Sequence, residues 1–280
     1  MREIPVSAVT DAVAELCVSA NIHLPEDVAE ALRRALPRET SPIGADILRT
    51  LLENAACARE AGLPICQDTG YAVVFADIGQ EVLFSGGDFE DAVNDGVRRG
   101  YTEGYLRASV VSDPLRRTNS GDNTPCALHI RLVRGDRLRL TVAPKGFGSE
   151  NCNALRMFTP STSREEITAF VAGVARAAGG NPCPPVILGV GLGGVSETCM
   201  LAARRALLRP VGPPHPDAFY AAWERDMLEA VNATGVGPQG LGGVTTALGV
   251  QIEALPTHIA GLPCAVCVSC HATRHREIVI

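Results

Sequence analysis

The sequence predicts an α/β protein with mixed sheets, helices packed around them, and a helical N-terminal third. Three observations support this fold class. Apolar residues recur at helical spacing through most of the first 62 residues, apolar and polar residues alternate in several short later segments, and no internal repeat interrupts this order. Such a succession of helices and strands is typical of mixed α/β architecture. We expect a single domain, 1–280, whose helical part covers about 1–62.

The predicted helices follow apolar stripes and recognisable end signals. Gly62 is a typical stop for the third helix, and Ser163 with Glu166 forms a capping box that opens a later one. The expected helices are Ser7–Ser19, Pro25–Leu36, Ala45–Ala61, Asp88–Arg107, Ser163–Ala178, Ser196–Leu208 and Asp217–Asn232.

The predicted strands are short and apolar or alternating. Two of them, Ala127–Val133 and Arg137–Val142, flank Gly135-Asp136, which is a hairpin signature. The other expected strands are Tyr71–Ile78, Val186–Val190, Val244–Leu255 and Cys264–Cys270.

Bulk composition narrows the function. Of the 280 residues 46% are hydrophobic and 20% charged, which is typical of a globular protein. The net charge of -6 argues against nucleic-acid binding, which needs a basic face. Neither a signal peptide nor an apolar run long enough for a membrane helix occurs, so we expect a cytoplasmic protein without a membrane partner. Disulfides are then not expected among the ten cysteines.

One glycine motif suggests a nucleotide site. Gly189–Gly194 fits the pattern G-x-G-x-x-G between a predicted strand and a predicted helix. A dinucleotide site also needs an acidic residue after a second strand, whereas Arg204–Pro216 is basic and rich in proline. An anion at the helix N-terminus and close packing of helix on strand are both compatible with these glycines.

The cysteines offer a metal site in two ways. Cys264, Cys267 and Cys270 form a C-x₂-C-x₂-C run, which would suit a non-catalytic iron–sulfur or metal-binding protein. If this run is a strand, Cys264 and Cys270 share a face and Cys267 points the other way. Alternatively, Cys270 acts with two distant cysteines, Cys66 and Cys183, which also stand at the edge of apolar segments beside turn-forming residues.

Four motifs in order resemble one enzyme family. They are Ile-Cys-Gln-Asp-Thr-Gly (65–70), Lys-Gly-Phe-Gly-Ser-Glu-Asn (145–151), Cys-Pro-Pro with Gly-Val-Gly-Leu-Gly-Gly (183–194), and Val-Ser-Cys-His-Ala-Thr-Arg (268–274). Together they resemble the iron–sulfur class I fumarase and L(+)-tartrate dehydratase family, and in particular its α subunit. The resemblance covers nearly the whole chain.

The resemblance implies a 4Fe–4S cluster held by Cys66, Cys183 and Cys270, with Cys264 and Cys267 not acting as ligands. Three cysteines would leave one iron open, and this iron would act as a Lewis acid on the substrate hydroxyl. The implied reaction is reversible hydration of a four-carbon dicarboxylate, with fumarate to malate expected first and tartrate to oxaloacetate next.

The resemblance also implies roles for other residues. Asp68 matches a catalytic acid/base position, although Asp68-Thr69-Gly70 also suits a simple Asx turn. His258 matches a catalytic histidine that would donate a hydrogen bond to the substrate or to Asp68. Arg107 matches a carboxylate-binding arginine, a role that suits its forked guanidinium. The remaining implied contacts to substrate are Gln67, Lys145 and the backbone of Gly146 and Gly148.

A partner chain is expected as well. Single-chain relatives carry a further C-terminal domain, whereas this sequence stops at Ile280. We therefore expect a separate β subunit to complete the site, in a dimer or heterotetramer of αβ pairs.

Overall fold

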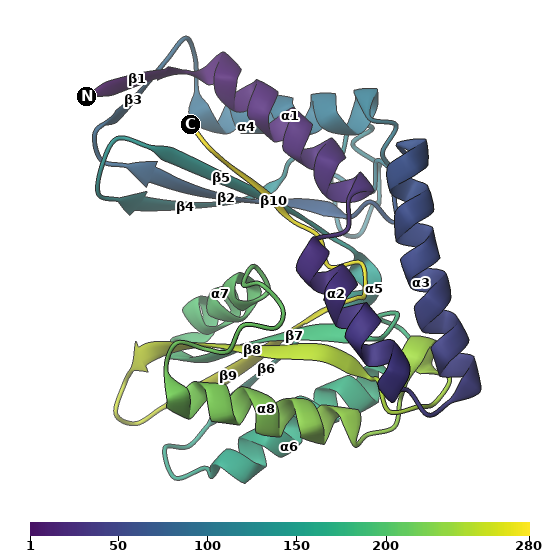
Figure 1. The fold of residues 1–280 in the computed structure, drawn as a ribbon. Coiled ribbons are helices and arrows are strands. Elements are labelled where there is room, and N and C mark those ends of the chain that lie inside the picture. Colours follow the sequence, from purple (N-terminus) through teal and green to yellow (C-terminus); the bar gives the residue numbers. More distant parts are fainter. The chain divides into compact units, whose positions relative to one another are not determined.

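The computed structural model describes residues 1–280, and the chain forms two compact units. Unit 1 contains Met1–Leu24, Ala55–Phe147 and Arg274–Ile280, and unit 2 contains Pro25–Asn54 and Gly148–Thr273. Both units combine helices with mixed sheets, which confirms the predicted α/β class (Figure 1). None of the helices has the length and apolar character needed to cross a membrane.

The main sheet of unit 1 is built on β2 (Tyr71–Gly79), which is almost wholly buried. β4 (Ala127–Val133) pairs with β2 in parallel, and β5 (Leu138–Lys145) pairs with its other edge in antiparallel. β10 (Arg276–Val279) extends the sheet beyond β5. The alternating residues 72, 74, 76 and 78 of β2 lie in the hydrophobic core, as expected for a strand with one face packed against helices.

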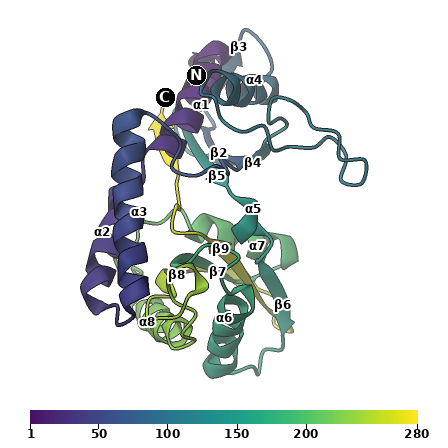
Figure 2. The same ribbon diagram turned by 90° about the vertical axis from the view of Figure 1, so that its right-hand side faces the viewer.

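Two helices cover this core face of the sheet. α1 (Val6–Ile22) and α4 (Phe89–Glu103) lie side by side above it (Figures 1 and 2). Gly96 and Gly100 of α4 allow the close approach, because a Cβ at either position would lie 2.7–2.8 Å from atoms of α1. A separate parallel pair, β1 (Arg2–Pro5) with β3 (Val82–Ser85), completes the unit.

The predicted hairpin of unit 1 is wrong in its pairing. Both strands exist, but β2 lies between β4 and β5, so the two do not touch. The turn around Gly135 instead crosses the end of β2, where Glu81 N–H donates to Gly135 O at 3.0 Å. Local alternation and a turn signal indicate adjacent strands, but they cannot reveal that an earlier, more apolar strand takes both pairing edges.

The sheet of unit 2 is built on β7 (Val186–Gly194). β8 (Ala247–Thr257) pairs with it in parallel and β9 (Leu262–Ser269) in antiparallel. β6 (Ala154–Phe158) lies outside β9. Helix α7 (Ser196–Ala206) covers one face of this sheet.

The other face of the unit 2 sheet carries α6 (Arg164–Ala178) and α8 (Ala218–Asn232) (Figures 1 and 2). The capping box of Ser163 and Glu166 is present at the start of α6, as predicted. Most other predicted helices and strands are present with shifted ends. The remaining helices are α2 (Glu26–Ala35), the 3₁₀ turn Leu36–Arg38, α3 (Pro42–Ala61), α5 (Phe147–Glu150) and the 3₁₀ turn Pro238–Gly240.

The glycine motif in β7 serves packing. A Cβ at Gly189 or Gly191 would lie 2.0 Å from a backbone oxygen of α7. These glycines therefore let the helix rest directly on the strand. No strand occurs between α7 and β8, so the second strand that a dinucleotide fold requires is missing there.

The two main sheets share one topology. In each, the central strand (β2 or β7) is connected through helix to a strand that pairs with one of its edges in parallel (β4 or β8). The chain then crosses the end of the central strand and pairs with its other edge in antiparallel (β5 or β9). The start of the central strand therefore lies beside the end of the antiparallel strand, at Tyr71 and Lys145 in unit 1 and at Ile187 and Ser269 in unit 2.

Candidate active site

The loop that carries Cys66, Gln67 and Asp68 enters the central strand of unit 1. Ile65 N–H donates to Asn21 O at 2.9 Å and fixes the start of the loop to α1. Cys66 is half-buried, and its Sγ lies 3.3 Å from Gln67 Oε1 and accepts the Asp68 N–H at 3.4 Å. Cys66 and Asp68 are thus presented by the same loop.

Each backbone carbonyl of residues 68–70 accepts a hydrogen bond from a buried side chain. Arg274 Nη2 donates to Asp68 O, and the Tyr101 hydroxyl lies 2.9 Å from Thr69 O and 3.0 Å from Gly70 O. Asn123 Nδ2 also donates to Gly70 O, at 3.1 Å. All three side chains are at most 5% exposed. A loop anchored in this way is held by the core of unit 1, because each buried donor would be costly to leave without its acceptor.

The Asp68 carboxylate is oriented by backbone amides. Its Oδ1 accepts the Gly70 N–H, which is the Asx turn anticipated from the sequence, and its Oδ2 accepts the Phe147 N–H, both at 3.0 Å. Gly146 leaves room for this contact, since a Cβ there would lie 3.2 Å from Oδ2. Turn formation and a chemical role are therefore compatible for Asp68.

Lys145 and Arg107 lie in the same unit. Lys145 is 7% exposed, and its Nζ donates to Gly146 O at 3.3 Å. Arg107 is exposed, and its backbone N–H donates to Thr69 Oγ1 at 2.9 Å. The predicted helix to Arg107 is too long, because α4 ends at Glu103. Arg107 is therefore a loop residue joined to the Asp68 loop, and not a cation in the last helical turn.

Unit 2 brings Cys183 and Cys270 to one end of its sheet. Cys183 precedes β7, is exposed, and has a φ of +53°, whereas Cys270 follows β9 and is half-buried. Because β7 and β9 are antiparallel, these two ends are adjacent. His271 joins them through its N–H and its Nδ1, which lie 3.4 and 2.9 Å from Cys183 O. Thr273 Oγ1 donates to Cys270 O at 2.8 Å.

Gln239 is a supporting residue that the sequence analysis missed. Its backbone N–H and its Nε2 donate to Pro184 O at 2.8 and 2.9 Å, and its Nε2 lies 3.4 Å from His271 Nδ1. It has a φ of +52° within a glycine-rich segment, 235–243. That composition signals a tight loop, but it does not show that the loop packs on a cysteine turn 56 residues earlier in the chain.

His258 and Gly148 lie elsewhere in unit 2. His258 is exposed in the turn between β8 and β9, where its Nδ1 accepts the Ala260 N–H at 3.2 Å. The length of β9, Leu262–Ser269, separates it from Cys270 by about 23 Å. Unit 2 therefore does not bring these two residues together. Gly148 is the first residue of the 145–151 motif that belongs to unit 2, and a Cβ there would lie 3.0 Å from Asn181 O.

The other cysteines are poor candidates for metal ligands. Burial raises the pKa of Cys126 and Cys199 to about 11 and that of Cys264 to about 12, and it also raises the pKa of Cys17. A metal ligand must be a thiolate, which burial disfavours. Cys267 faces α7, with its Sγ 3.5 Å from Met200 Sδ. The C-x₂-C-x₂-C run thus lies along a strand whose first two cysteines point to opposite faces, as predicted.

The donor chemistry of Cys66, Cys183 and Cys270 fits an iron–sulfur cluster. All three are free thiols in loops at the ends of strands, and none is fully buried. Cys66 belongs to unit 1 and the other two belong to unit 2. The structure contains no group of three or more His, Cys, Asp or Glu side chains arranged to hold a single metal ion.

Comparisons with known proteins identify the family. The sequence profile described as fumarate hydratase (Fumerase) matches residues 10–279. A Methanocaldococcus jannaschii protein named "Putative L(+)-tartrate dehydratase subunit alpha" is 41% identical over 273 residues, which cover 95% of each chain. The L(+)-tartrate dehydratase subunit alpha of Escherichia coli O157:H7 is 30% identical over 98% of this chain and 91% of its own. The chain therefore belongs to the fumarate hydratase (Fumerase) family.

Proposed function

We propose that this chain is the α subunit of an iron–sulfur hydro-lyase that adds water to, or removes it from, a four-carbon dicarboxylate. The Cys66–Gly70 loop is the observation that carries this proposal. It presents a thiol and a carboxylate two residues apart, and buried side chains hold all three carbonyls at its end. Membership in the fumarate hydratase family supports the same reaction class.

Cys66, Cys183 and Cys270 would hold the 4Fe–4S cluster. When bound, such a cluster supplies an iron without a protein ligand, which can act as a Lewis acid toward a substrate hydroxyl. The protein's part is to set the thiols at fixed positions. The Asp68 loop does this in unit 1, and the contact of His271 and Gln239 with the Cys183 turn does it in unit 2.

Asp68 is our candidate for the acid/base group. Its carboxylate accepts two backbone N–H groups, which orient it and leave further lone pairs for a proton of the substrate or of water. Its spacing from Cys66 ties it to the position of the proposed centre. The simple Asx turn explains only one of the two contacts.

Substrate carboxylates require cations and amide donors. Arg107 is exposed and anchored by its backbone to Thr69, so its guanidinium is available for a bidentate contact. We propose Gln67, Lys145 and the backbone of Gly146 and Gly148 as further contacts. In unit 1, Gln67 is exposed and Lys145 is buried.

His258 has a role in this proposal only if a second chain provides it. A centre at Cys270 lies about 23 Å along β9 from the turn that carries His258. A dimer of αβ pairs would allow the His258 of one α chain to serve the centre of the other. Mixing His258→Asn and Cys270→Ser chains should then restore part of the activity that each variant lacks alone, whereas no gain on mixing would remove His258 from the mechanism.

The β subunit and the substrate are also part of the proposal. The relatives are named as α subunits of L(+)-tartrate dehydratases, which supports a partner chain and makes L(+)-tartrate a substrate to test beside fumarate and malate. The sequence analysis favours fumarate and malate, and the two substrate pairs differ by one hydroxyl group.

Anaerobic reconstitution tests the function. We expect the α chain with iron, sulfide and a matching β subunit to convert malate to fumarate or L(+)-tartrate to oxaloacetate, and the α chain alone to show little activity. An αβ complex that retains a cluster but converts neither substrate would overturn the proposal. Full activity of the α chain alone would overturn the need for β.

A further inference from the structure

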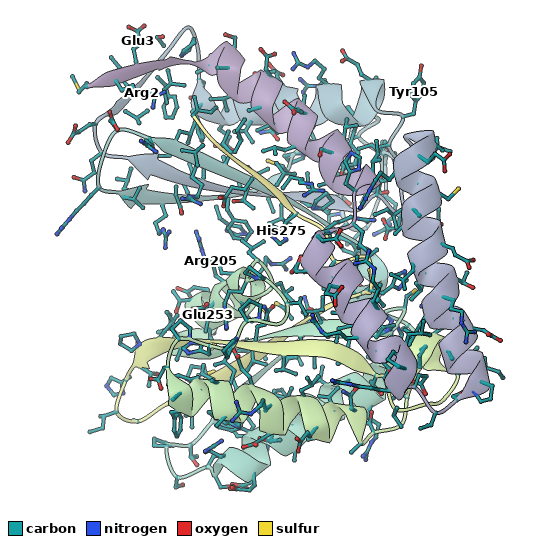
Figure 3. All side chains as sticks on the ribbon, in the orientation of Figure 1. Arg2, Glu3, Tyr105, Arg205, Glu253 and His275 are labelled. Atoms are coloured by element: carbon teal, nitrogen blue, oxygen red, sulfur yellow. The ribbon has the colours of Figure 1, made fainter.

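Arg274 is a buried cation with too few partners. Its side chain is 5% exposed, and its Nη2 donates to Asp68 O. Its Nε and Nη1 are buried without a hydrogen-bond acceptor, and no carboxylate forms an ion pair with it. It stands just before β10, next to His275, which Figure 3 labels.

Fold stability alone does not account for this arrangement. A guanidinium cannot lose its proton in a protein, so it is buried as a full charge. Removing a charge from water costs more than one hydrogen bond to a neutral carbonyl returns. An apolar residue of similar size would leave Asp68 O without this donor, but it would also remove the cost of burying the charge. A buried charge of this kind, in contact with a candidate site, points to a functional role.

The position of Arg274 shows what that role is. The carbonyl that it holds belongs to Asp68, and Cys66 lies two residues before it. Tyr101 and Asn123 hold the next two carbonyls as neutral donors, so Arg274 is the single charged anchor of the loop. Its uncompensated positive charge lies under a loop that would meet a thiolate-bound cluster and a dianionic substrate.

We propose that Arg274 is a positioning residue of the hydro-lyase centre, which fixes the Cys66 thiol and the Asp68 carboxylate and places a permanent positive charge beneath them. This inference rests on the proposed function for its effect on catalysis. Its effect on the loop does not depend on that function, because it follows from the hydrogen bond to Asp68 and can be measured on the full α chain.

Arg274→Met tests the inference, and Arg276→Met is the matched control. Arg276 belongs to the same segment and has a buried Nε without a partner, but its Nη2 donates to His23 O, away from the loop. In the α chain without iron, we expect Arg274→Met to raise the alkylation rate of Cys66 about fivefold or more, because the loop opens more often. Its thermal midpoint should stay level or rise.

In the reconstituted αβ enzyme, Arg274→Met should lower kcat roughly 10- to 100-fold at wild-type iron content. Arg274→Lys should recover part of this loss, and Arg276→Met should lose little. A lower thermal midpoint in Arg274→Met with an unchanged alkylation rate of Cys66 would show a structural anchor only and overturn the inference. If the wild-type complex is inactive, the proposed function fails, but the alkylation rate and the thermal midpoint still decide whether Arg274 positions the loop. If Arg274→Met does not fold, the alkylation rate of Cys66 in Arg274→Lys decides instead.

Discussion

Units 1 and 2 build the same structural corner in two different ways. In each, the loop before the central strand meets the loop after the antiparallel strand. In unit 1 that corner holds Cys66 and Asp68 and is anchored by buried side chains of α4, the following loop and the C-terminal segment. In unit 2 it holds Cys183 and Cys270, and the contacts are made by half-buried or exposed groups, His271 and Gln239.

This difference suggests a division of labour. The corner of unit 1 is anchored by buried side chains and contains the carboxylate, which suits the positioning of reacting groups. The corner of unit 2 contains two thiols and the imidazole of His271, which suits retention of a cluster. Changes in the support of unit 1 should therefore reduce turnover, and changes in the support of unit 2 should reduce cluster retention.

The largest effects should separate ligand from acid/base group. Cys183→Ser should lose the cluster and, with it, nearly all activity. Asp68→Asn should keep the cluster and lose about 10²- to 10⁴-fold in kcat, as expected for removal of a general acid or base. Iron analysis and initial rates measure both, with the exposed Cys57→Ser as control. Loss of iron in Asp68→Asn at full activity per remaining cluster would contradict the proposed division.

Tyr101→Phe should have the next largest effect on kcat. It removes the hydroxyl that contacts two successive carbonyls of the loop, at a cost of about 1–3 kcal/mol in the free energy of unfolding. We expect kcat to fall roughly tenfold with iron content unchanged. Tyr105→Phe is the control, because Tyr105 is 94% exposed just after α4 (Figure 3). Equal effects of the two changes would show that the anchoring of the loop does not matter.

Gln239→Ala should reduce cluster retention and leave turnover unchanged, the reverse of the effect expected for Tyr101→Phe. It removes the side-chain donor to Pro184 O and the contact with His271, so the Cys183 turn becomes looser. We expect the cluster to be lost about 10 times faster in air or chelator, with activity per remaining cluster unchanged, since support around metal ligands typically matters by 10–100-fold. Gln251→Ala, whose Nε2 donates to Arg209 O and Pro210 O instead, should reduce stability without this effect.

Glu39→Gln should produce the smallest effect, on stability alone. Partial burial acts to raise the pKa of Glu39, but amide donors from Ser41, Thr245 and Val244 outweigh it and the pKa lies below its ordinary value of 4.5. The carboxylate therefore stabilises unit 2 above about pH 4.5, and this stabilisation is lost as the pH falls through the lower folded-state pKa. The free energies of unfolding of the two proteins in urea should differ by about 1 kcal/mol or less at pH 7, because the carboxylate is only partly buried, and should converge in acid; a constant difference across this range would contradict the assignment.

Local patterns in the sequence predicted most helices and long strands, because amphipathic stripes and caps are local signals. The capping box at Ser163 and the buried strand β2 are examples. The pairing of β4 with β2 in place of β5 was missed, since the choice of strand partner depends on distant segments. The edge strands β1, β3, β6 and β10 were missed because each has only four or five residues.

The candidate site follows the same rule. The Asx turn at Asp68 could be predicted from three adjacent residues. The anchors of that loop, Tyr101, Asn123 and Arg274, lie 31–206 residues away from the groups they hold. Arg274 ends one of the four family motifs, but the residues around the three anchors do not indicate which carbonyl each side chain holds. The contact of Gln239 with the Cys183 turn was hidden for the same reason.

Iron content across a cysteine series tests the central claim most directly. The αβ complex is reconstituted anaerobically with each cysteine changed to serine in turn, and iron and the visible spectrum are measured with and without malate or L(+)-tartrate. We predict about four irons per α chain in wild type, Cys264→Ser and Cys267→Ser, with a spectrum that shifts on adding substrate, and loss of the cluster in Cys66→Ser, Cys183→Ser and Cys270→Ser. A cluster that survives Cys66→Ser or Cys183→Ser but is lost in Cys264→Ser and Cys267→Ser would contradict the account.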